Sequence, residues 1–539
     1  IVPKKLWQRV AAEWTRRGGP EEFAEENTLA VSTALTWRKN RTLSSMLTAD
    51  FRQSDAQVTP GIPEYRPAGA TRIVGPYLPL AYFNANGPDA GVRRRSAVVG
   101  LQFDSQPSKN LALRASIEGW WRDVEQDRFT TSVLSLATGL FEGIREPRHV
   151  EQPQQAVALQ LEATGRYRIG HTDHKLLASA SQTWGVYDRE ERALTTDERN
   201  NLPPTVLRFD PFQPDYYRPP FSAAVYSRIL TDRTEDARYT SAEVSDRVAL
   251  QRGIWVLTGG LRYDAVDLSV EDRKPNAPFP SLSDTTQQIS YHAGLNYQVV
   301  RNRLLFFTSA STAFDPSTRV DARTGRIQPN ETTRGYEAGL KGRTADSKWE
   351  GNGAVFLLYN QNISRRNPLY DDPIADIAQT QPQLVAAGEE RYTGVRFDGR
   401  WVPTKAVTMG LKIVYMDAIT TASPALPWEV GKAITRLPAL TGSLQLRYRS
   451  QVPTGGPTAG IAMQYVSNYV ANYQDGVHGY LEYPDYALLS LSAGYVWKTK
   501  TRTIETELAV RNALDRDLLA SNARVGAPRE FVVSARMYF

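Results

Sequence analysis

The sequence contains no cysteine and only five histidines among its 539 residues. Without cysteine the chain can form neither a disulfide framework nor a thiolate metal site, and five scattered histidines offer little for a histidine-based site. Runs of about 18 or more apolar residues, which a membrane-spanning helix needs, are also missing. We therefore expect neither a disulfide-stapled fold nor a bundle of transmembrane helices.

An excess of one charge is missing as well. The 64 basic and 58 acidic residues are interspersed and leave a net charge of +6. Nucleic-acid binding needs basic side chains clustered on one face, so we expect no nucleic-acid partner. The motifs of phosphate-binding loops, dinucleotide-binding folds and HExxH metalloproteases do not occur. We expect no enzyme activity, no catalytic residues, no cofactor and no bound metal.

Aromatic residues are plentiful for so polar a chain, with 11 Trp, 26 Tyr and 17 Phe at a mean hydropathy of −0.44. Segments of alternating apolar and polar residues recur throughout. In residues 156–169, for example, Val157 and Leu161 share one face, while Gln160 and Glu162 share the other. A tilted strand of about 10 residues can cross a bilayer. The pattern predicts transmembrane strands, with aromatic girdles at the two membrane interfaces.

Short turns and long polar stretches alternate between these segments. Short turns are expected at residues 39–41 and 170–173, and long loops at 52–91 and 188–241. This order is typical of outer-membrane β-barrels, which have short periplasmic turns and long extracellular loops. A large soluble all-β protein is the alternative. It fits less well, because loops longer than about 15 residues are uncommon in compact domains.

The last ten residues alternate and end in an aromatic carboxy-terminus. The side chains that share the apolar face include Phe531, Val533, Met537 and Phe539. Such a strand resembles the signal by which the barrel assembly machinery recognises outer-membrane barrels for insertion. The other interpretation is an ordinary terminal strand that happens to end in phenylalanine.

Counting strands backward from the C-terminus gives about 20. The C-terminus of such a barrel lies in the periplasm, so the last strand runs toward the periplasm. The segment at 28–39 leads into a short periplasmic turn, so it runs in the same direction and must also be an even-numbered strand. If the full barrel has about 22 strands, as plugged transporters do, this strand is the fourth and 4–14 is the third. We therefore expect residues 1–539 to form one all-β domain, a transmembrane antiparallel β-barrel without its first two strands.

Several segments resemble the siderophore-receptor group of TonB-dependent outer-membrane receptors. The matching segments are GGLRYD (259–264), TSASTAF (308–314), PNE (329–331), GYEAGLK (335–341) and RNALD (511–515). They occur in the order of the family and lie within roughly residues 240–539. Each motif is weak by itself, whereas the ordered set is fairly specific.

The resemblance implies an active transporter in the bacterial outer membrane that imports a ferric siderophore or a similar chelate. Its partners would be outer-membrane lipid, the chelate, the barrel assembly machinery and TonB, which acts through an N-terminal plug. Residues 1–26 match neither the plug nor the TonB box, so we expect the plug to be absent from this chain.

Other functions stay open at this point. TonB-dependent uptake of cobalamin, another metal chelate or a saccharide would fit the same resemblance. A barrel enzyme would need a Ser/His pair, and none stands out. An adhesin would lack the family motifs.

Aromatic side chains in two long loops are the candidates for ligand contact, because aromatic faces can stack on siderophore rings. The candidates are Tyr65, Tyr77, Tyr82, Phe83, Phe212, Tyr216, Tyr217 and Phe221. They could instead hold the loops together or belong to the outer aromatic girdle. Arg262, Glu337 and Lys341 alternate with apolar neighbours, so we expect them to form charge networks in a polar lumen rather than to contact ligand.

Overall fold

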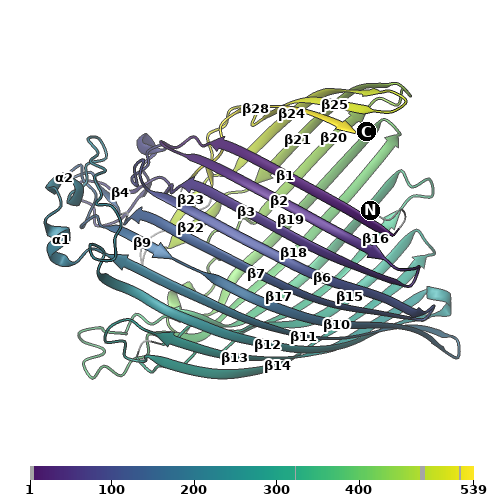
Figure 1. The fold of residues 1–539 in the computed structure, drawn as a ribbon, viewed down its shortest axis with the longest axis horizontal. Coiled ribbons are helices and arrows are strands. Elements are labelled where there is room, and N and C mark those ends of the chain that lie inside the picture. Colours follow the sequence, from purple (N-terminus) through teal and green to yellow (C-terminus); the bar gives the residue numbers. More distant parts are fainter. Residues whose placement is uncertain (1–4, 131, 322, 474–479, 521–523, 539) are drawn as a thin grey trace. The chain divides into compact units, whose positions relative to one another are not determined.

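Long antiparallel strands dominate the computed structural model, which describes residues 5–130, 132–321, 323–473, 480–520 and 524–538 (Figure 1). No helix within these ranges has the length and apolar character needed to span a membrane. The chain divides into two compact units. The first comprises Ile1–Val248, Gly259–Tyr291 and Pro316–Gln328, and the second comprises Ala249–Thr258, His292–Asp315 and Pro329–Phe539.

In the first unit, successive long strands pair with each other along the chain. The register of β1 with β2 runs without a break from Leu6–Trp37 to Gly18–Glu25. The short strand β9 and the strand β10 have the same two neighbours, β7 and β11, so they act as one interrupted strand. The paired strands are β1 (Leu6–Gly18), β2 (Glu25–Arg38), β3 (Leu43–Gln57), β6 (Gly91–Ser108), β7 (Leu111–Phe129), β9 (Pro147–Glu151), β10 (Gln154–Ile169) and β11 (Thr172–Ala193).

The second unit repeats this arrangement from the end of β14 to β28. Each long strand again pairs antiparallel with the next long strand. The strands are β15 (Leu304–Asp315), β16 (Glu331–Arg343), β17 (Trp349–Arg366), β18 (Leu384–Thr404), β19 (Val407–Ala422), β20 (Leu440–Arg449), β21 (Gly455–Val466), β24 (Tyr486–Lys498), β25 (Thr503–Arg511) and β28 (Glu530–Tyr538).

The remaining elements are three long strands and several short pieces. The long strands are β12 (Arg228–Leu250), β13 (Trp255–Asp272) and β14 (Ser281–Val300). In the loops of the second unit lie η3 (Pro427–Glu429), β22 (Tyr469–Tyr473), β23 (Tyr480–Tyr483), β26 (Leu519–Ala520) and β27 (Arg524–Val525), and η2 (Gln251–Gly253) follows β12.

The number of strands agrees with the sequence-based expectation. Within the described ranges, twenty-one strands take part in the antiparallel pairing of the long strands. Counting β9 and β10 as one strand leaves twenty positions, as expected. The alternation of connections is also confirmed, because β10–β11 and β18–β19 are joined by the short turns 170–171 and 405–406, whereas residues 58–90 separate β3 from β6.

The predicted bounds of one long loop, 188–241, are wrong at both ends. Strand β11 continues to Ala193 and β12 already begins at Arg228. These strand ends carry charged side chains in place of the apolar alternation, and ion pairs such as Arg148–Glu191 at 3.1 Å link them to neighbouring strands. A search for alternating apolar residues cannot detect a strand that is held by polar pairs.

The long strands have one apolar and one polar face, and the apolar side chains are exposed. On β10, Leu161 is 51% exposed, and on β28 Val533 is 81% exposed on the same face as Phe531 and Met537. Exposure of apolar area to water costs about 25 cal/mol per Å², so rows of such side chains require an apolar surrounding. Phe539, the last residue of the expected insertion signal, lies outside the described residues.

Exposed tryptophans gather in positions expected of membrane interfaces. Trp349 and Trp401 are register partners beside short turns of the second unit. In the first unit, the exposed Trp121 and Trp184 lie far along their strands from the short turns. Aromatic girdles at both edges of an apolar band are typical of transmembrane barrels.

Replacing Leu161 by arginine should reduce the free energy of unfolding in phospholipid vesicles by about 2–4 kcal/mol, because the guanidinium would face hydrocarbon. Gln160→Arg is the matched control, since Gln160 lies next to Leu161 on the polar face, and it should leave the free energy nearly unchanged. Equal losses for the two variants would contradict the assignment of the faces.

Candidate functional site

Three long loops of the first unit fold together into what we call the loop cluster, residues 58–90, 132–146 and 194–227. Its elements are β4 (Glu64–Arg66), β5 (Gly75–Pro76), η1 (Leu78–Leu80), β8 (Leu134–Ser135), α1 (Thr196–Asn200) and α2 (Pro204–Leu207). Figure 1 shows β4, α1 and α2 gathered at one end of the long strands. Tyr65 pairs antiparallel with Gly75 and parallel with Leu134, so a small sheet joins the first two loops.

The loop cluster has two small hydrophobic cores. The first consists of Leu80, Phe83, Ala85, Leu134, Phe141 and Phe209, which come from all three loops. The second consists of Leu194, Leu202, Val206 and Tyr226 packed on Phe129 at the end of β7. Segments far apart in the sequence are therefore held together by buried apolar side chains, which makes the cluster an ordered platform.

A buried arginine links the two cores. The Arg145 side chain donates to the carbonyl oxygens of Ala85 (2.5 Å) and Asp215 (3.1 Å). Its guanidinium lies over the ring of Phe129 at 3.5 Å and over that of Phe209 at 4.0 Å. Burial lowers the pKa of Arg145 to about 9, and carbonyl dipoles and aromatic faces offset part of the cost of burying its charge.

Local geometry supports these contacts. The capping box formed by Thr195 and Glu198 begins α1, because each side chain accepts from the backbone amide of the other residue. Gly87 has a φ of +76°, and a Cβ atom there would lie 2.5 Å from the ring of Tyr216. This position therefore requires glycine for both its backbone conformation and its close contact.

All eight aromatic candidates lie within the loop cluster, and four of them belong to its first core or pack against it. Phe83 is buried in the first core, and Tyr65, Tyr77 and Tyr216 pack against that core. The rings of Tyr65 and Tyr77 meet edge to face at 5.2 Å. Burial raises the pKa of Tyr216 to about 12. In this structure these four side chains hold the loops together.

The other four candidates are more exposed. Tyr82, Phe212 and Tyr217 have exposed fractions of 41%, 57% and 54%. Phe221 stacks on the ring of His149 at 3.4 Å with an interplanar angle of 16°. Tyr82, Phe212 and Tyr217 are therefore the most exposed side chains of the predicted set.

His149 and its neighbours were missed by the sequence analysis. His149 is almost fully buried, with Nδ1 2.9 Å from Asp127 and Nε2 3.2 Å from Glu151. Arg218, on the third loop, pairs with Asp127 at 2.8 Å. Together with the stacking of Phe221, these contacts tie the third loop to β7 and β9. No local motif marks them, because the partners come from three separate segments.

The three residues expected in charge networks lie on the polar face. In the first unit, Arg262 pairs with Asp264 at 2.8 Å and approaches Glu243 at 3.9 Å. In the second unit, Glu337 on β16 pairs with Arg396 on β18, across the intervening β17. Lys341 lies 4.7 Å from the centre of the Phe307 ring.

Gly339 on β16 lies in close contact with the neighbouring strands β15 and β17. A Cβ atom on Gly339 would lie 2.3 Å from the carbonyl oxygen of Gly353 and 2.8 Å from the Phe307 ring. Glycine at this position therefore lets β16 lie tightly against its neighbours beside Glu337 and Lys341.

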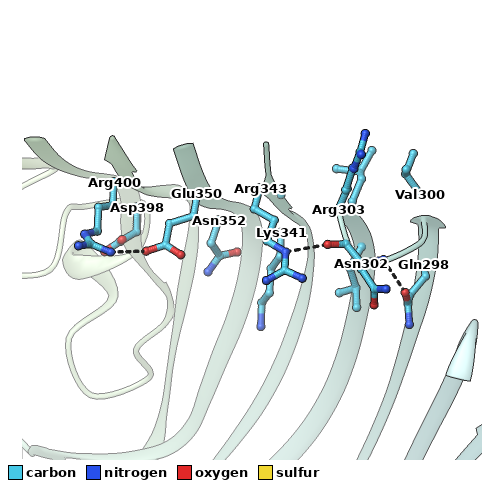
Figure 2. A pocket seen from close by; sticks show the side chains of 14 residues that line it. Gln298, Val300, Asn302, Arg303, Lys341, Arg343, Glu350, Asn352, Asp398 and Arg400 are labelled. Atoms are coloured by element: carbon cyan, nitrogen blue, oxygen red, sulfur yellow. Dashed lines mark hydrogen bonds and ion pairs between the residues drawn. The ribbon is translucent and has the colours of Figure 1, made fainter. Parts of the chain in front are cut away.

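A polar pocket of about 550 Å³ lies on the same face of the second unit, at its short-turn end (Figure 2). Arg400 donates to Glu350 at 3.2 Å, and Arg343 donates to the carbonyl oxygen of Asn302 at 2.7 Å. Within the ranges that the structure describes, no group of three or more His, Cys, Asp or Glu side chains is arranged to hold a metal ion.

The fold and these features define an outer-membrane β-barrel, and a family comparison makes the class specific. Residues 36–513 match the family model described as TonB dependent receptor-like, beta-barrel. The chain therefore belongs to the TonB-dependent receptor family, and the predictions of family, fold class and outer-membrane localisation are confirmed. The family consists of transport receptors and not of enzymes, in agreement with the expectation from sequence.

Individual relatives are distant in sequence. The chain is 23% identical over 485 residues to the metal-pseudopaline receptor CntO of Pseudomonas aeruginosa, covering 88% of this chain and 63% of that receptor. It thus spans less than two thirds of that relative's length. The fold also matches that of the ferric preacinetobactin receptor BauA of Acinetobacter baumannii, with a TM-score of 0.80, 16% identity and coverage of 100% of this chain and 76% of BauA.

A second solved structure shows the same fold. The ferric-catecholate import receptor Fiu of E. coli K12 gives a TM-score of 0.81 at 12% identity, and the match covers 100% of this chain and 78% of Fiu. At such low identities, these two structures are informative about the fold alone.

Arg145→Met should loosen the loop cluster, because the carbonyl oxygens of Ala85 and Asp215 would lose their donor. We expect a loss of about 2 kcal/mol in local stability, which makes cleavage by chymotrypsin roughly 10- to 30-fold faster. The control is Arg208→Met, which changes an exposed arginine in the same cluster. Unchanged cleavage of the Arg145 variant would show that the contacts of Arg145 do not contribute to the stability of the loop cluster.

Glu337 and Arg396 should be energetically coupled. A double-mutant cycle with Glu337→Gln and Arg396→Gln, followed by unfolding in vesicles, should give a coupling energy of about 0.5–1 kcal/mol, since the pair is partly exposed. Strictly additive effects would indicate that the contact between Glu337 and Arg396 does not contribute to the free energy of unfolding.

Proposed function

We propose that this chain is the membrane-spanning part of a receptor that imports a ferric siderophore, with energy supplied through TonB. The observation that carries the proposal is the loop cluster, which presents Tyr82, Phe212 and Tyr217 on an ordered platform at the long-loop end of the strands. Aromatic faces favour contact with planar or cationic groups of a ligand.

The family and the names of the similar receptors support the proposal that the cargo is a metal chelate. The metal-pseudopaline, ferric preacinetobactin and ferric-catecholate receptors all take their names from metal chelates. Coupling to TonB would act through a plug domain. The receptor would bind its cargo outside the cell and release it inward without covalent chemistry.

Uptake of a chelate of another metal is the second candidate. It is favoured by the name of the curated relative, which refers to a metal chelate without specifying iron. Cobalamin and saccharides are further cargoes compatible with the family, although no feature of the loop cluster favours them.

Binding is best tested by quenching of intrinsic fluorescence in the purified protein. Ferric siderophores of distinct chemistry should be compared with their iron-free forms, with chelates of other metals, with cobalamin and with oligosaccharides. Saturable quenching by a ferric siderophore is the expected result. Quenching by another cargo alone would reassign the substrate, and no quenching by any of them would overturn the proposal.

Replacing Tyr82, Phe212 and Tyr217 together by alanine should weaken binding of the cargo about tenfold or more, because each aromatic contact contributes roughly 0.5–1.5 kcal/mol. The matched control is Tyr263→Ala, since Tyr263 is similarly exposed but lies on the apolar face. Equal affinity of the triple variant and the parent protein would rule out these three residues as ligand contacts.

A further inference from the structure

The short turns of the second unit contain many more basic than acidic residues. These turns are residues 251–254, 301–303, 344–348, 405–406, 450–454 and 499–502. Their exposed basic side chains, which we call the basic row, are Arg252, Arg301, Arg303, Lys348, Lys405, Lys500 and Arg502. The four long loops after β17, residues 367–383, 423–439, 467–485 and 512–529, have the opposite balance, with five basic and nine acidic residues. Positive charge is therefore concentrated at the short-turn end of this unit.

Backbone contacts place neighbouring turns of the basic row side by side. The side chain of Gln298 joins the first two turns, since it donates to the carbonyl oxygen of Gly253 at 2.7 Å and accepts from the amide of Asn302 at 2.9 Å. The amide-to-carbonyl bonds that join the later turns are Arg343 to Arg303 (2.8 Å), Val402 to Lys348 (2.6 Å), Arg449 to Ala406 (2.8 Å) and Lys498 to Thr454 (3.0 Å). Adjacent strands lie about 4.8 Å apart, so successive turns follow one another at roughly 10 Å.

The basic row lies just beyond exposed tryptophans on the apolar face. The tryptophans beside the turns are Trp349, Trp401 and Trp497, with exposed fractions of 37%, 47% and 45%. Trp349 directly follows Lys348 in the chain, and Trp497 precedes the turn that contains Lys500. Tryptophan side chains of membrane proteins lie at the level of the lipid head groups, and a strand rises about 3.3 Å per residue. The basic row is therefore within reach of the head groups.

Little negative charge balances the basic row within the turns. Asp346 is the single acidic residue of these turns, and it lies 3.6 Å from the ammonium of Lys348 in a pair that is exposed on both sides. Exposed ion pairs are weak and break easily. Arg303 points away from Lys341 and Arg343, which lie on the polar face (Figure 2). The short turns of the first unit have the same sign, with Lys39, Arg41 and Lys109 and no acidic residue.

The spacing of the basic row fits a layer of anions better than one compact ligand. A small-molecule site needs polar groups that converge on a common point, whereas these side chains follow one another along an edge. Anionic phospholipids attract basic segments at the membrane surface, and the attraction acts within a Debye length of about 8–10 Å. Lysine and arginine both bind phosphate groups.

We propose that the basic row binds the phosphate groups of anionic phospholipids in the leaflet on the short-turn side, which is the periplasmic leaflet of the outer membrane. The lipid contact continues the apolar surface of the strands past the tryptophans into the head-group layer. The proposal rests on the membrane position of the barrel and is independent of the cargo.

A single fluorescent label in the basic row tests the proposal. The 539 residues contain no cysteine, so Ala345→Cys provides one labelling site among them, in the exposed turn between those that carry Arg303 and Lys405. The labelled receptor in phosphatidylcholine vesicles is titrated with phosphatidylglycerol or phosphatidylcholine that carries a nitroxide quencher near the head group. Half-maximal quenching should need about fivefold less phosphatidylglycerol, the factor that one basic side chain contributes near an anionic surface. Equal quenching by the two lipids would overturn the proposal.

Salt and the position of the label provide two controls. In 1 M salt, charges are screened beyond about 3 Å, so the preference for phosphatidylglycerol should fall below about twofold. A label at Thr435→Cys, exposed in the long loop 423–439, should show a preference below about twofold at low salt as well. A preference that resists salt, or one of equal size at both labels, would contradict binding by the basic row.

Neutral variants should remove the preference from the Ala345→Cys label. Arg301→Gln/Arg303→Gln/Lys348→Gln/Lys405→Gln should reduce it at least threefold, because cations are lost on both sides of the label. The matched control Arg301→Lys/Arg303→Lys/Lys348→Arg/Lys405→Arg keeps every charge and should keep the preference. Equal losses in both variants would indicate a structural effect of the turns and overturn the assignment. If the neutral variant does not fold, Arg301→Gln/Lys405→Gln replaces it, and an unchanged preference would count against the proposal.

Soluble anions distinguish lipid from other partners of the basic row. Inorganic phosphate and a short aspartate-rich peptide, each at about 1 mM, should leave the preference for phosphatidylglycerol unchanged, because neither is concentrated at the membrane surface. Loss of the preference with the peptide would show that the basic row takes an acidic polypeptide instead of lipid. Loss with phosphate would show that it takes a free anion.

Discussion

Backbone hydrogen bonding inside the lipid layer is the constraint on which the rest of this structure depends. Lipid offers no partner to an amide or carbonyl group, so each strand must be satisfied by its neighbours. The unbroken antiparallel register of β10 with β11, from Gln154–Tyr187 to Ile169–Thr172, meets this requirement. Such pairing directs successive side chains to opposite faces, which produces the exposed apolar face and the polar face that carries the charges.

Outside the lipid layer the same chain must stabilise itself in another way. The loop cluster buries aromatic and aliphatic side chains in two small cores and places Arg145 between them. A buried cation without a carboxylate is costly, and the contacts with two carbonyl oxygens and two aromatic rings offset that cost. The exposed aromatic side chains beside these cores are thereby held on an ordered surface.

Charged side chains on the polar face of the second unit have two kinds of partner. Glu337 and Arg396 form an ion pair across the intervening strand β17. Toward the short turns, the ammonium of Lys341 lies over the Phe307 ring, and Arg343 donates to the carbonyl oxygen of Asn302. Strand β16 therefore carries one residue of an ion pair and, a few residues away, two basic side chains with neutral partners.

The sequence alone determined the strands, the order of short turns and long loops and the apolar face, because a period of two is a local pattern that any strand facing lipid must show. It could not separate Tyr82, which is exposed, from its neighbour Phe83, which is buried in the loop core. Nor could it identify Arg145 or His149. Their partners lie on distant segments, and only the tertiary structure decides which loops meet, because burial depends on contacts such as that between Phe83 and Phe209 that no local pattern encodes.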